Sequence, residues 1–382
     1  MRKTRKTMII SLCLAVLLLI CTPALLSAEA VRVPDDELMN IPVYHEPELG
    51  GVFIDVSADR FLELGFAYGD SVNIAFSNGY SLEDVPYFNG YYVRPGDILV
   101  TGTFGLRYLK VCINYGEDVW TRANLSEGDT ADISMCEKAK YLNIQNIASV
   151  ELVNDRSAFS SDEVFANFRS LKGGNLKEDY LYRSASPCDN VYNRAHYADK
   201  LMTDAGVRFI LNLEDGEEKI NQYKEKDDFD SPGFQALYEE GKVALAPITT
   251  NYTSEEFRSG LIDGLRALAH SDGPYLIHCM AGRDRTGFAC MLLEALAGSS
   301  CDEIIDDYMI TYQNYYGVTK EGDPETYGLI RDINIIPMIS FMAGVTEEAV
   351  QTVDYAASAE RYLKEGGMSE EDIRLLKAAI LK

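Results

Sequence analysis

Positive charge is scarce in this chain. Its 382 residues include 35 lysines and arginines against 60 aspartates and glutamates, so the formal net charge is −25 at pH 7. A field of this sign excludes binding to nucleic acid or to an anionic membrane through bulk attraction. Any site for an anion must therefore be a local positive hollow in an acidic body.

Metal-ligating side chains are scarce as well. The four histidines lie at scattered positions (45, 196, 270 and 278), and no pair of cysteines has the spacing of zinc ligands. We therefore expect no metal site and no cofactor. Six of the eight cysteines follow residue 30, and their spacing shows no disulfide framework.

The N-terminal region has one apolar run, from Met8 to Ile20, which is shorter than the about 20 residues of a membrane-spanning helix. A basic head precedes the run, and small residues follow it at Ser27, Ala28 and Ala30. This pattern predicts a secretory signal peptide over residues 1–30, and an uncleaved membrane anchor is the alternative. We expect a secreted or cell-surface protein with no stable membrane insertion after the signal is cleaved.

Residues 31–150 show short strands separated by turns. The segments 52–56, 71–76 and 108–113 are strand-like, and turn signals that contain Gly, Asn and Pro lie around them. The pattern predicts a small β-rich accessory domain, either a barrel or a sandwich. An aromatic cluster at 87–92 is either a binding face or core, and cross-strand packing in the core is the interpretation we favour.

Residues 151–382 alternate strands with helices. Buried strands are predicted at 207–213 and 243–247, and a capping signal at 253–256 precedes a helix that ends at Ala269. This alternation predicts an α/β domain with a mostly parallel sheet flanked by helices. It is followed by a C-terminal tail that is helical by pattern and is expected to pack on the domain.

In that tail, segments 302–316 and 346–363 are amphipathic, and Ser369 precedes three acidic residues at the start of a last short helix.

One ten-residue stretch, 278–287, carries chemistry. An apolar strand at 275–277 leads into it, and a largely apolar helix follows it. A loop that enters a helix N-terminus directs backbone N–H groups and the helix dipole at one point. Arg285 adds a planar fork of donors suited to phosphate oxygens, and the same positive field favours the thiolate of Cys279. The loop can therefore hold a phosphate dianion above a nucleophile.

The stretch 278–287, with the letters HCMAGRDRTG, resembles the phosphate-binding loop of the cysteine-dependent protein tyrosine phosphatase superfamily. It is most similar to the HCxAGKDRTG-like loop of bacterial phosphatases that act on phosphotyrosine and phosphoinositides, which usually have Lys at the position of Arg283. Three further stretches resemble flanking motifs of that group: 166–169, 181–186 and 306–309. The likeness covers about residues 163–315 and does not extend to 31–150.

The resemblance implies a two-step phosphomonoesterase reaction. Cys279 attacks phosphorus as a thiolate and forms a phosphocysteine, while Arg285 and the loop N–H groups hold the equatorial oxygens. Thr286 is expected to donate its hydroxyl to the departing sulfur, and His278 is expected to order the loop. The residues expected to bind substrate are Met280, Ala281, Gly282, Arg283, Thr286 and Gly287.

Three arginines each keep two interpretations. Arg169 and Arg183 either contact the phosphate or take part in structural ion pairs that brace the loop. Arg283 either engages a second acidic group, such as another phosphate on an inositol ring, or is a solvated charge at the loop tip.

The proton donor to the leaving group is less clear, because this chain has Asn212 where the resembling group carries an Asp. Glu214 and Asp215 are nearby substitutes. Asp284 lies inside the loop, beside Arg285, and we rank Asp284 first and Asp215 second as the general acid. The alternative for Asp284 is an ion pair that orients a neighbouring arginine.

We therefore expect a secreted phosphatase whose partner is a phosphorylated protein or a phosphoinositide. A phytase-like inositol polyphosphate phosphatase is one alternative. The phytases of the superfamily carry their acid on a Trp-containing loop, whereas the single tryptophan here, Trp120, lies outside the catalytic region. A non-catalytic phosphate-binding module is the other alternative, and the presence of both Cys279 and Arg285 counts against it.

Overall fold

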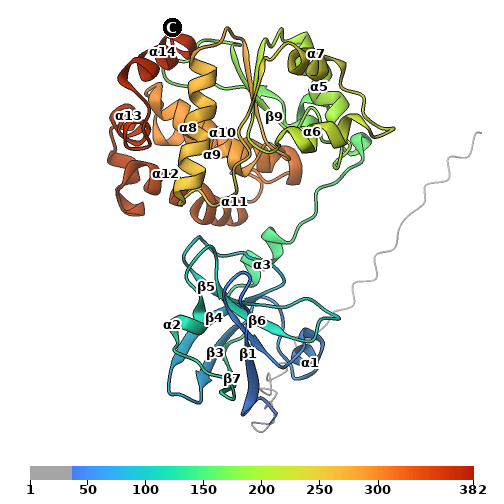
Figure 1. The fold of residues 1–382 in the computed structure, drawn as a ribbon, viewed down its shortest axis with the longest axis vertical. Coiled ribbons are helices and arrows are strands. Elements are labelled where there is room, and N and C mark those ends of the chain that lie inside the picture. The colour runs from blue at the N-terminus through green and yellow to red at the C-terminus, as the bar shows by residue number, and fades with distance from the viewer. Residues whose placement is uncertain (1–36) are drawn as a thin grey trace, which may run out of the picture.

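The computed structural model describes residues 37–382, which form two parts (Figure 1). A β-barrel lies at one end of the molecule, and a sheet surrounded by helices lies at the other. The predicted signal peptide, residues 1–30, falls outside the described residues. In the part of the chain from 37 onward, no helix is long and apolar enough to cross a membrane.

The barrel is closed by seven strands in the order β1-β2-β6-β5-β4-β3-β7. The strands are β1 (Ile41–His45), β2 (Val52–Ile54), β3 (Ser71–Phe76), β4 (Ser81–Phe88), β5 (Ile98–Thr101), β6 (Leu109–Ile113) and β7 (Thr130–Glu137). Three short helices accompany them: α1 (Ala58–Glu63), α2 (Val119–Arg122) and α3 (Leu142–Ala148). Closure pairs every strand on both sides, and the apolar residues that alternate along the strands fill the interior.

The aromatic cluster at 87–92, interpreted above as either core or a binding face, contains both buried and exposed residues. Tyr87 and Phe88 end β4 and are fully buried, so they are core residues. Tyr91 is half exposed, and both Tyr91 and Tyr92 line a cavity that the barrel shares with the second part.

The second part is built on a five-stranded sheet in the order β11-β10-β12-β9-β8. The strands are β8 (Arg169–Ser170), β9 (Leu181–Ser184), β10 (Phe209–Asn212), β11 (Val243–Leu245) and β12 (Tyr275–His278). The pairs among β9, β12, β10 and β11 are parallel, and only β8 runs antiparallel to its neighbour. His278 lies opposite both Asn212 and Ser184, so the segments that follow three parallel strands emerge side by side at one edge.

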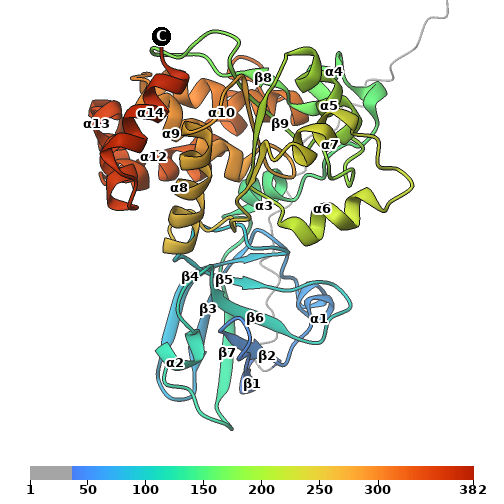
Figure 2. The same ribbon diagram turned by 45° about the horizontal axis from the view of Figure 1, so that its top comes forward.

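Helices cover both faces of this sheet, as the views of Figures 1 and 2 agree. On one face lie α5 (Ala195–Asp204), α6 (Glu217–Lys224) and α7 (Pro232–Glu239), and on the other lie α8 (Glu255–Ala269) and α9 (Asp284–Leu296). Successive strand residues point to opposite faces of the sheet. Ile210 and Leu276 pack on the side of α5, α6 and α7, and Leu211 and Ile277 pack on the side of α8 and α9. Burial on both faces explains why these strands are continuous apolar runs.

The chain after α9 is helical and packs on the α8–α9 side of the sheet. It contains α10 (Cys301–Tyr316), α11 (Pro324–Ile330), a π-helical stretch (Arg331–Ile335), α12 (Ile336–Ala343), α13 (Tyr355–Glu365) and α14 (Glu370–Ile380). The helix expected over 346–363 is two separate elements, a 3₁₀ helix (Glu347–Thr352) and α13, because the helical conformation is interrupted at 353–354. Asp354 caps α13 by accepting the Ala357 N–H. At α8 the cap is Ser254, which accepts the Phe257 N–H.

Candidate active site

The loop 279–283 connects the carboxyl end of β12 to the N-terminus of α9. Its backbone makes a tight turn at Gly282, where φ is +63°. A Cβ atom built on Gly282 would lie 2.1 Å from the Ser184 carbonyl oxygen, so no side chain fits there. The loop is thus pressed against the end of β9, and its N–H groups lie at the positive end of a buried helix.

Two arginines and one aspartate brace the loop from behind. Arg183 is 1% exposed and donates from Nη2 to the Gly282 carbonyl oxygen at 2.8 Å and from Nη1 to Asp307 at 2.6 Å. Arg169 donates from Nε to the other oxygen of Asp307 at 2.8 Å. Burial alone would raise the pKa of Asp307, but the two guanidinium groups hold that pKa below its ordinary value. Both arginines therefore act as braces in this structure.

The nucleophile candidate, Cys279, is buried at the floor of the loop. His278 precedes it on β12 and is fully buried, which lowers the pKa of its imidazole to about 3, so the ring is neutral. The His278 Nδ1 atom lies 3.4 Å from the Cys279 carbonyl oxygen. The Thr286 hydroxyl is buried and has no hydrogen-bond partner among residues 37–382.

Arg285 and Met280 both contact Glu214, an acid named above as a nearby substitute for the missing aspartate but given no rank. Arg285 donates from Nη1 to the Ile248 carbonyl oxygen at 3.1 Å, and its Nη2 forms an ion pair with Glu214 Oε2. The same Glu214 oxygen accepts the Met280 N–H at 3.0 Å. The strand register accounts for this contact. Asn212 of β10 pairs with His278 of β12, so Glu214 and Met280, each two residues further along the chain, lie side by side.

The two ranked acids occupy different surroundings. The side chain of Asp284 is 34% exposed, sits in the first turn of α9 and forms an ion pair with Arg283 at 3.0 Å. Asp215 is 2% exposed, and its oxygens accept from the Tyr223 hydroxyl at 3.0 Å and from the Asn212 amide at 3.1 Å. Burial raises the pKa of Asp215, while the bonds from Asn212 and Tyr223 lower it.

Arg283 is not a free charge at the loop tip. Besides Asp284 it contacts the Tyr316 hydroxyl at 3.1 Å, and its guanidinium lies 5.9 Å from the ring centre of Tyr312. The next helix also holds the loop backbone, because the Tyr315 hydroxyl donates to the Ala281 carbonyl oxygen at 2.7 Å. The side of the loop that carries Arg283 is therefore packed against α10.

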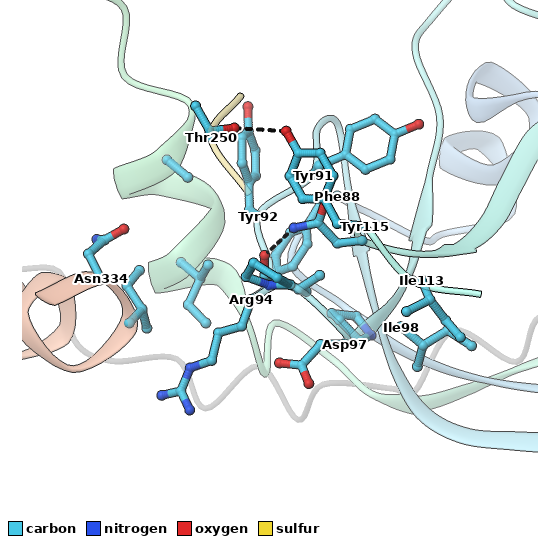
Figure 3. Close-up of a pocket in the computed structure, with 18 of the residues that line it drawn as sticks. Phe88, Tyr91, Tyr92, Arg94, Asp97, Ile98, Ile113, Tyr115, Thr250 and Asn334 are labelled. Carbon is cyan, nitrogen blue, oxygen red and sulfur yellow. Dashed lines mark hydrogen bonds between the residues drawn. The ribbon is translucent and has the colours of Figure 1, made fainter. Parts of the chain in front are cut away.

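A cavity of about 970 Å³ lies between this side of the loop and the barrel. Arg283, Asp284 and Tyr312 line it from the sheet-and-helix part. Figure 3 shows residues of the barrel that line the cavity, among them Phe88, Tyr91, Tyr92, Arg94 and Tyr115. The Tyr115 hydroxyl lies 2.8 Å from Thr250 Oγ1, so the barrel contacts the segment that also holds Arg285 through Ile248.

The structure brings Met280 and Arg285 into contact with Glu214, with Cys279 in the same loop and Thr286 in the first turn of α9. Asp215 follows Glu214 in the chain and is buried. Gly287 belongs to the first turn of α9, where its N–H donates to the Arg283 carbonyl oxygen at 2.8 Å. Sequence reasoning did not single out Asp307 as the centre of the brace or Tyr315 as a loop contact. Within the described residues, no group of three or more His, Cys, Asp or Glu side chains could hold a metal ion.

Comparison with known proteins adds several likenesses. The model of the tyrosine phosphatase family matches residues 163–382. A tyrosine-protein phosphatase of Nostoc commune is 31% identical over 131 residues, which cover 30% of this chain and 42% of that protein. A protein of Cupriavidus necator that has been provisionally named a tyrosine-protein phosphatase is 28% identical over 120 residues. The match covers 31% of this chain and 43% of that protein. The chain thus spans less than half the length of these relatives.

Among solved structures, the core catalytic domain of a PP-IP phosphatase from S. cerevisiae, determined in complex with citrate, is 19% identical. The match covers 44% of this chain and 91% of that domain, with a TM-score of 0.26.

Proposed function

The chain belongs to the tyrosine phosphatase family, and we propose that it is a cysteine-dependent phosphomonoesterase. The observation that carries the proposal is the placement of Cys279 directly after β12 and of Arg285 in the first turn of α9, on either side of the loop that joins them. A helix N-terminus, loop N–H groups and a guanidinium together form a site for a phosphate dianion, with a thiol beneath it.

The reaction has two displacement steps. In the first, the Cys279 sulfur forms a bond to phosphorus, the ester P–O bond breaks, and the leaving oxygen takes up a proton from a general acid. In the second, a water oxygen attacks the phosphocysteine, the S–P bond breaks, and the water proton returns to the same acid. Arg285 and the loop N–H groups stabilise the charge on the equatorial oxygens in both steps. Thr286 donates its hydroxyl to the sulfur as it departs.

Asp284 is the general acid in this proposal, and Asp215 is the second candidate. Asp284 is directly before Arg285 and borders an open cavity, which gives a leaving group access to its carboxyl. Asp215 is buried and both of its oxygens are already bonded, which counts against a direct transfer. The remaining expected substrate contacts are made by the loop residues from Met280 to Gly282 and by Arg283.

The substrate is a phosphate monoester, which we propose to be phosphotyrosine on a protein, a phosphoinositide, or both. The names of the two relatives support phosphotyrosine, and the resemblance of the loop supports both classes. A phytase-like activity on inositol polyphosphates is the second candidate, and Trp120 counts against it because it lies in α2 of the barrel. The pattern of residues 1–30 supports secretion or display at the cell surface.

A panel of three substrates tests the proposal: an aryl phosphate or phosphotyrosyl peptide, a phosphoinositide, and phytate. We expect release of phosphate from the first two classes, and a loss of more than about 10³-fold in the Cys279→Ser variant because the nucleophile is gone. Cys136→Ser is the matched control, since Cys136 is an exposed residue of the barrel. If the parent protein and Cys279→Ser are equally inactive on all three classes, the enzyme proposal fails.

A further inference from the structure

The anion-binding loop already has an anionic side chain against it. One oxygen of Glu214, Oε2, accepts the Met280 N–H at 3.0 Å and forms the ion pair with Arg285 Nη2. A loop N–H and the loop arginine are the two kinds of donor that the proposed function assigns to phosphate oxygens. The Glu214 carboxylate therefore occupies a position that an oxygen of the substrate would need.

The local backbone holds Glu214 in this position. Asn212 ends β10, is fully buried, and accepts the N–H groups of Glu214 at 2.8 Å and of Asp215 at 3.0 Å through its side-chain oxygen. This Asx turn folds the chain back after the strand and aims Glu214 along the edge where β12 ends. The Glu214 side chain is 14% exposed, so it is largely shielded from water.

We propose that Glu214 is a tethered competitor for the phosphate site, and that a phosphoryl dianion enters the site as the Glu214 carboxyl group is displaced and takes up one proton. The inference rests on the proposed function, because it concerns the same loop. Three negative charges within one partly buried pocket repel each other strongly. Uptake of a proton by Glu214 removes that repulsion and leaves Arg285 and Met280 free for the ligand.

The charged and titratable groups around Glu214 set the direction of this coupling. Burial raises the pKa of Glu214, Arg285 on α9 lowers it, and the adjacent Asp215 raises it. The thiol of Cys279 shares the loop with the Met280 N–H. Beyond Asp215 lie Asp189, the Tyr223 hydroxyl and Cys188, while His278 on β12 is neutral because burial lowers the pKa of its imidazole.

A pH dependence of ligand binding follows from these positions. In the ligand-free protein Arg285 stabilises the charged form of Glu214, whereas a bound dianion withdraws Arg285 and adds negative charge, so the pKa of Glu214 is higher in the complex. Between the two pKa values, binding requires a proton, and the affinity for a dianion falls about tenfold for each unit of pH increase. Below the ligand-free value the affinity is constant. Binding of the dianion is therefore favoured on the acidic side.

Inorganic sulfate is the probe that tests this proposal, because it remains a dianion throughout the mildly acidic and neutral range and is not turned over. The full chain is used in a Cys279→Ser background, which removes the thiol of the loop. Calorimetry in two buffers of different ionisation enthalpy counts the protons taken up on binding. We expect about one proton per sulfate near neutral pH, with an affinity that falls as the pH rises.

The decisive comparison adds Glu214→Gln to the same background. The amide keeps the shape of the side chain but carries no charge, so we expect no proton uptake, an affinity independent of pH, and sulfate binding tighter by about tenfold or more near neutral pH. Glu217→Gln is the matched control, since Glu217 is an exposed acid at the start of α6. It should leave both the proton count and the affinity unchanged.

Four results would count against the inference. Equal proton uptake with and without Glu214 would overturn it, as would binding in Glu214→Gln that is weaker but keeps the same pH dependence, because Glu214 would then only position Arg285. If sulfate binds without proton uptake in either protein, the inference fails and the proposed function stands. If sulfate does not bind to the loop at all, the phosphate site of the proposed function fails as well.

Discussion

At the scale of single residues, the loop depends on a set of buried charges that lie outside it. Asp307 accepts from Arg169 and Arg183, and Arg183 in turn donates to the Gly282 carbonyl oxygen of the loop. Each of these groups is buried or nearly so, and a buried charge is tolerated only when its partners are present. Removing one member of this set leaves the others uncompensated.

Asp307→Asn is expected to destabilise the protein by about 3–5 kcal/mol, because it leaves two buried guanidinium groups without their counter-charge. Asp306→Asn, at an exposed position on the same helix, should cost less than about 1 kcal/mol. Because the folded-state pKa of Asp307 is lowered, its stabilisation is complete above the ordinary pKa of Asp, about 3.9, and is lost as the pH falls below it. Urea unfolding at several pH values measures both effects, and equal midpoints for the two variants would contradict the argument.

The general acid can be assigned from the leaving group. An alkyl phosphate needs the proton most, since an alkoxide is a poor leaving group, whereas an activated aryl phosphate needs it least. Asp284→Asn is expected to reduce kcat on an alkyl phosphate by about 10²–10⁴-fold and to spare the activated aryl ester. Asp215→Asn should not distinguish the two substrates: both activities should stay unchanged or fall by the same factor. The reverse pattern would move the role to Asp215.

The sequence allowed Cys279 and Arg285 to be placed, because their spacing within one loop is itself the geometry of an anion site. It could not show the contact of Glu214 with Arg285 and Met280. That contact depends on the pairing of Asn212 with His278, which are distant in the chain. The role of Asp307 depends in the same way on three elements that meet only in the folded protein.

At the scale of elements, a strand or helix can be predicted from the sequence when its hydrophobic pattern matches its burial in the folded protein. The strand, loop and helix around residue 279 could be predicted, because burial on both sides of the sheet gives a continuous apolar run that ends at a glycine-containing loop. Strand β4 could not, since it contains Pro86 and its Asp84 has a φ of +55° at a register shift against β3. Its pairing is decided by barrel closure.

Gly282 provides a test of the loop as an element. Gly282→Ala is expected to abolish sulfate binding and turnover, because the new methyl group would lie 2.1 Å from the Ser184 carbonyl oxygen and would displace the loop from β9. Gly298 has a similar positive φ of +78° but open space around it. Gly298→Ala should therefore cost only about 1–2 kcal/mol of backbone strain and keep activity. Similar activity in both variants would show that the close approach to Ser184 is not required.

At the scale of the whole molecule, the barrel and the sheet-and-helix part have separate hydrophobic cores, joined by polar contacts and by Ile147 of α3, which packs against the second core. Arg94 of the barrel forms an ion pair with Glu347 at 2.5 Å, and the Tyr115 hydroxyl lies 2.8 Å from Thr250 Oγ1. The cavity between the two parts is lined by residues of both. Exposed ion pairs and single hydrogen bonds contribute about 0–1.5 kcal/mol each, so this interface is weak compared with either core.

Two unfolding transitions are therefore expected in a calorimetric scan of the full chain, one for each core. Ile74→Ala removes a buried side chain of the barrel, and Leu211→Ala removes one beneath α8 and α9. Each should destabilise its own part by about 2–5 kcal/mol and shift only one of the transitions to lower temperature. Loss of the proposed phosphatase activity on heating should follow the transition that Leu211→Ala shifts, because the loop is built on that core. A single transition that both variants shift equally would mean that the barrel and the catalytic part fold as one cooperative unit.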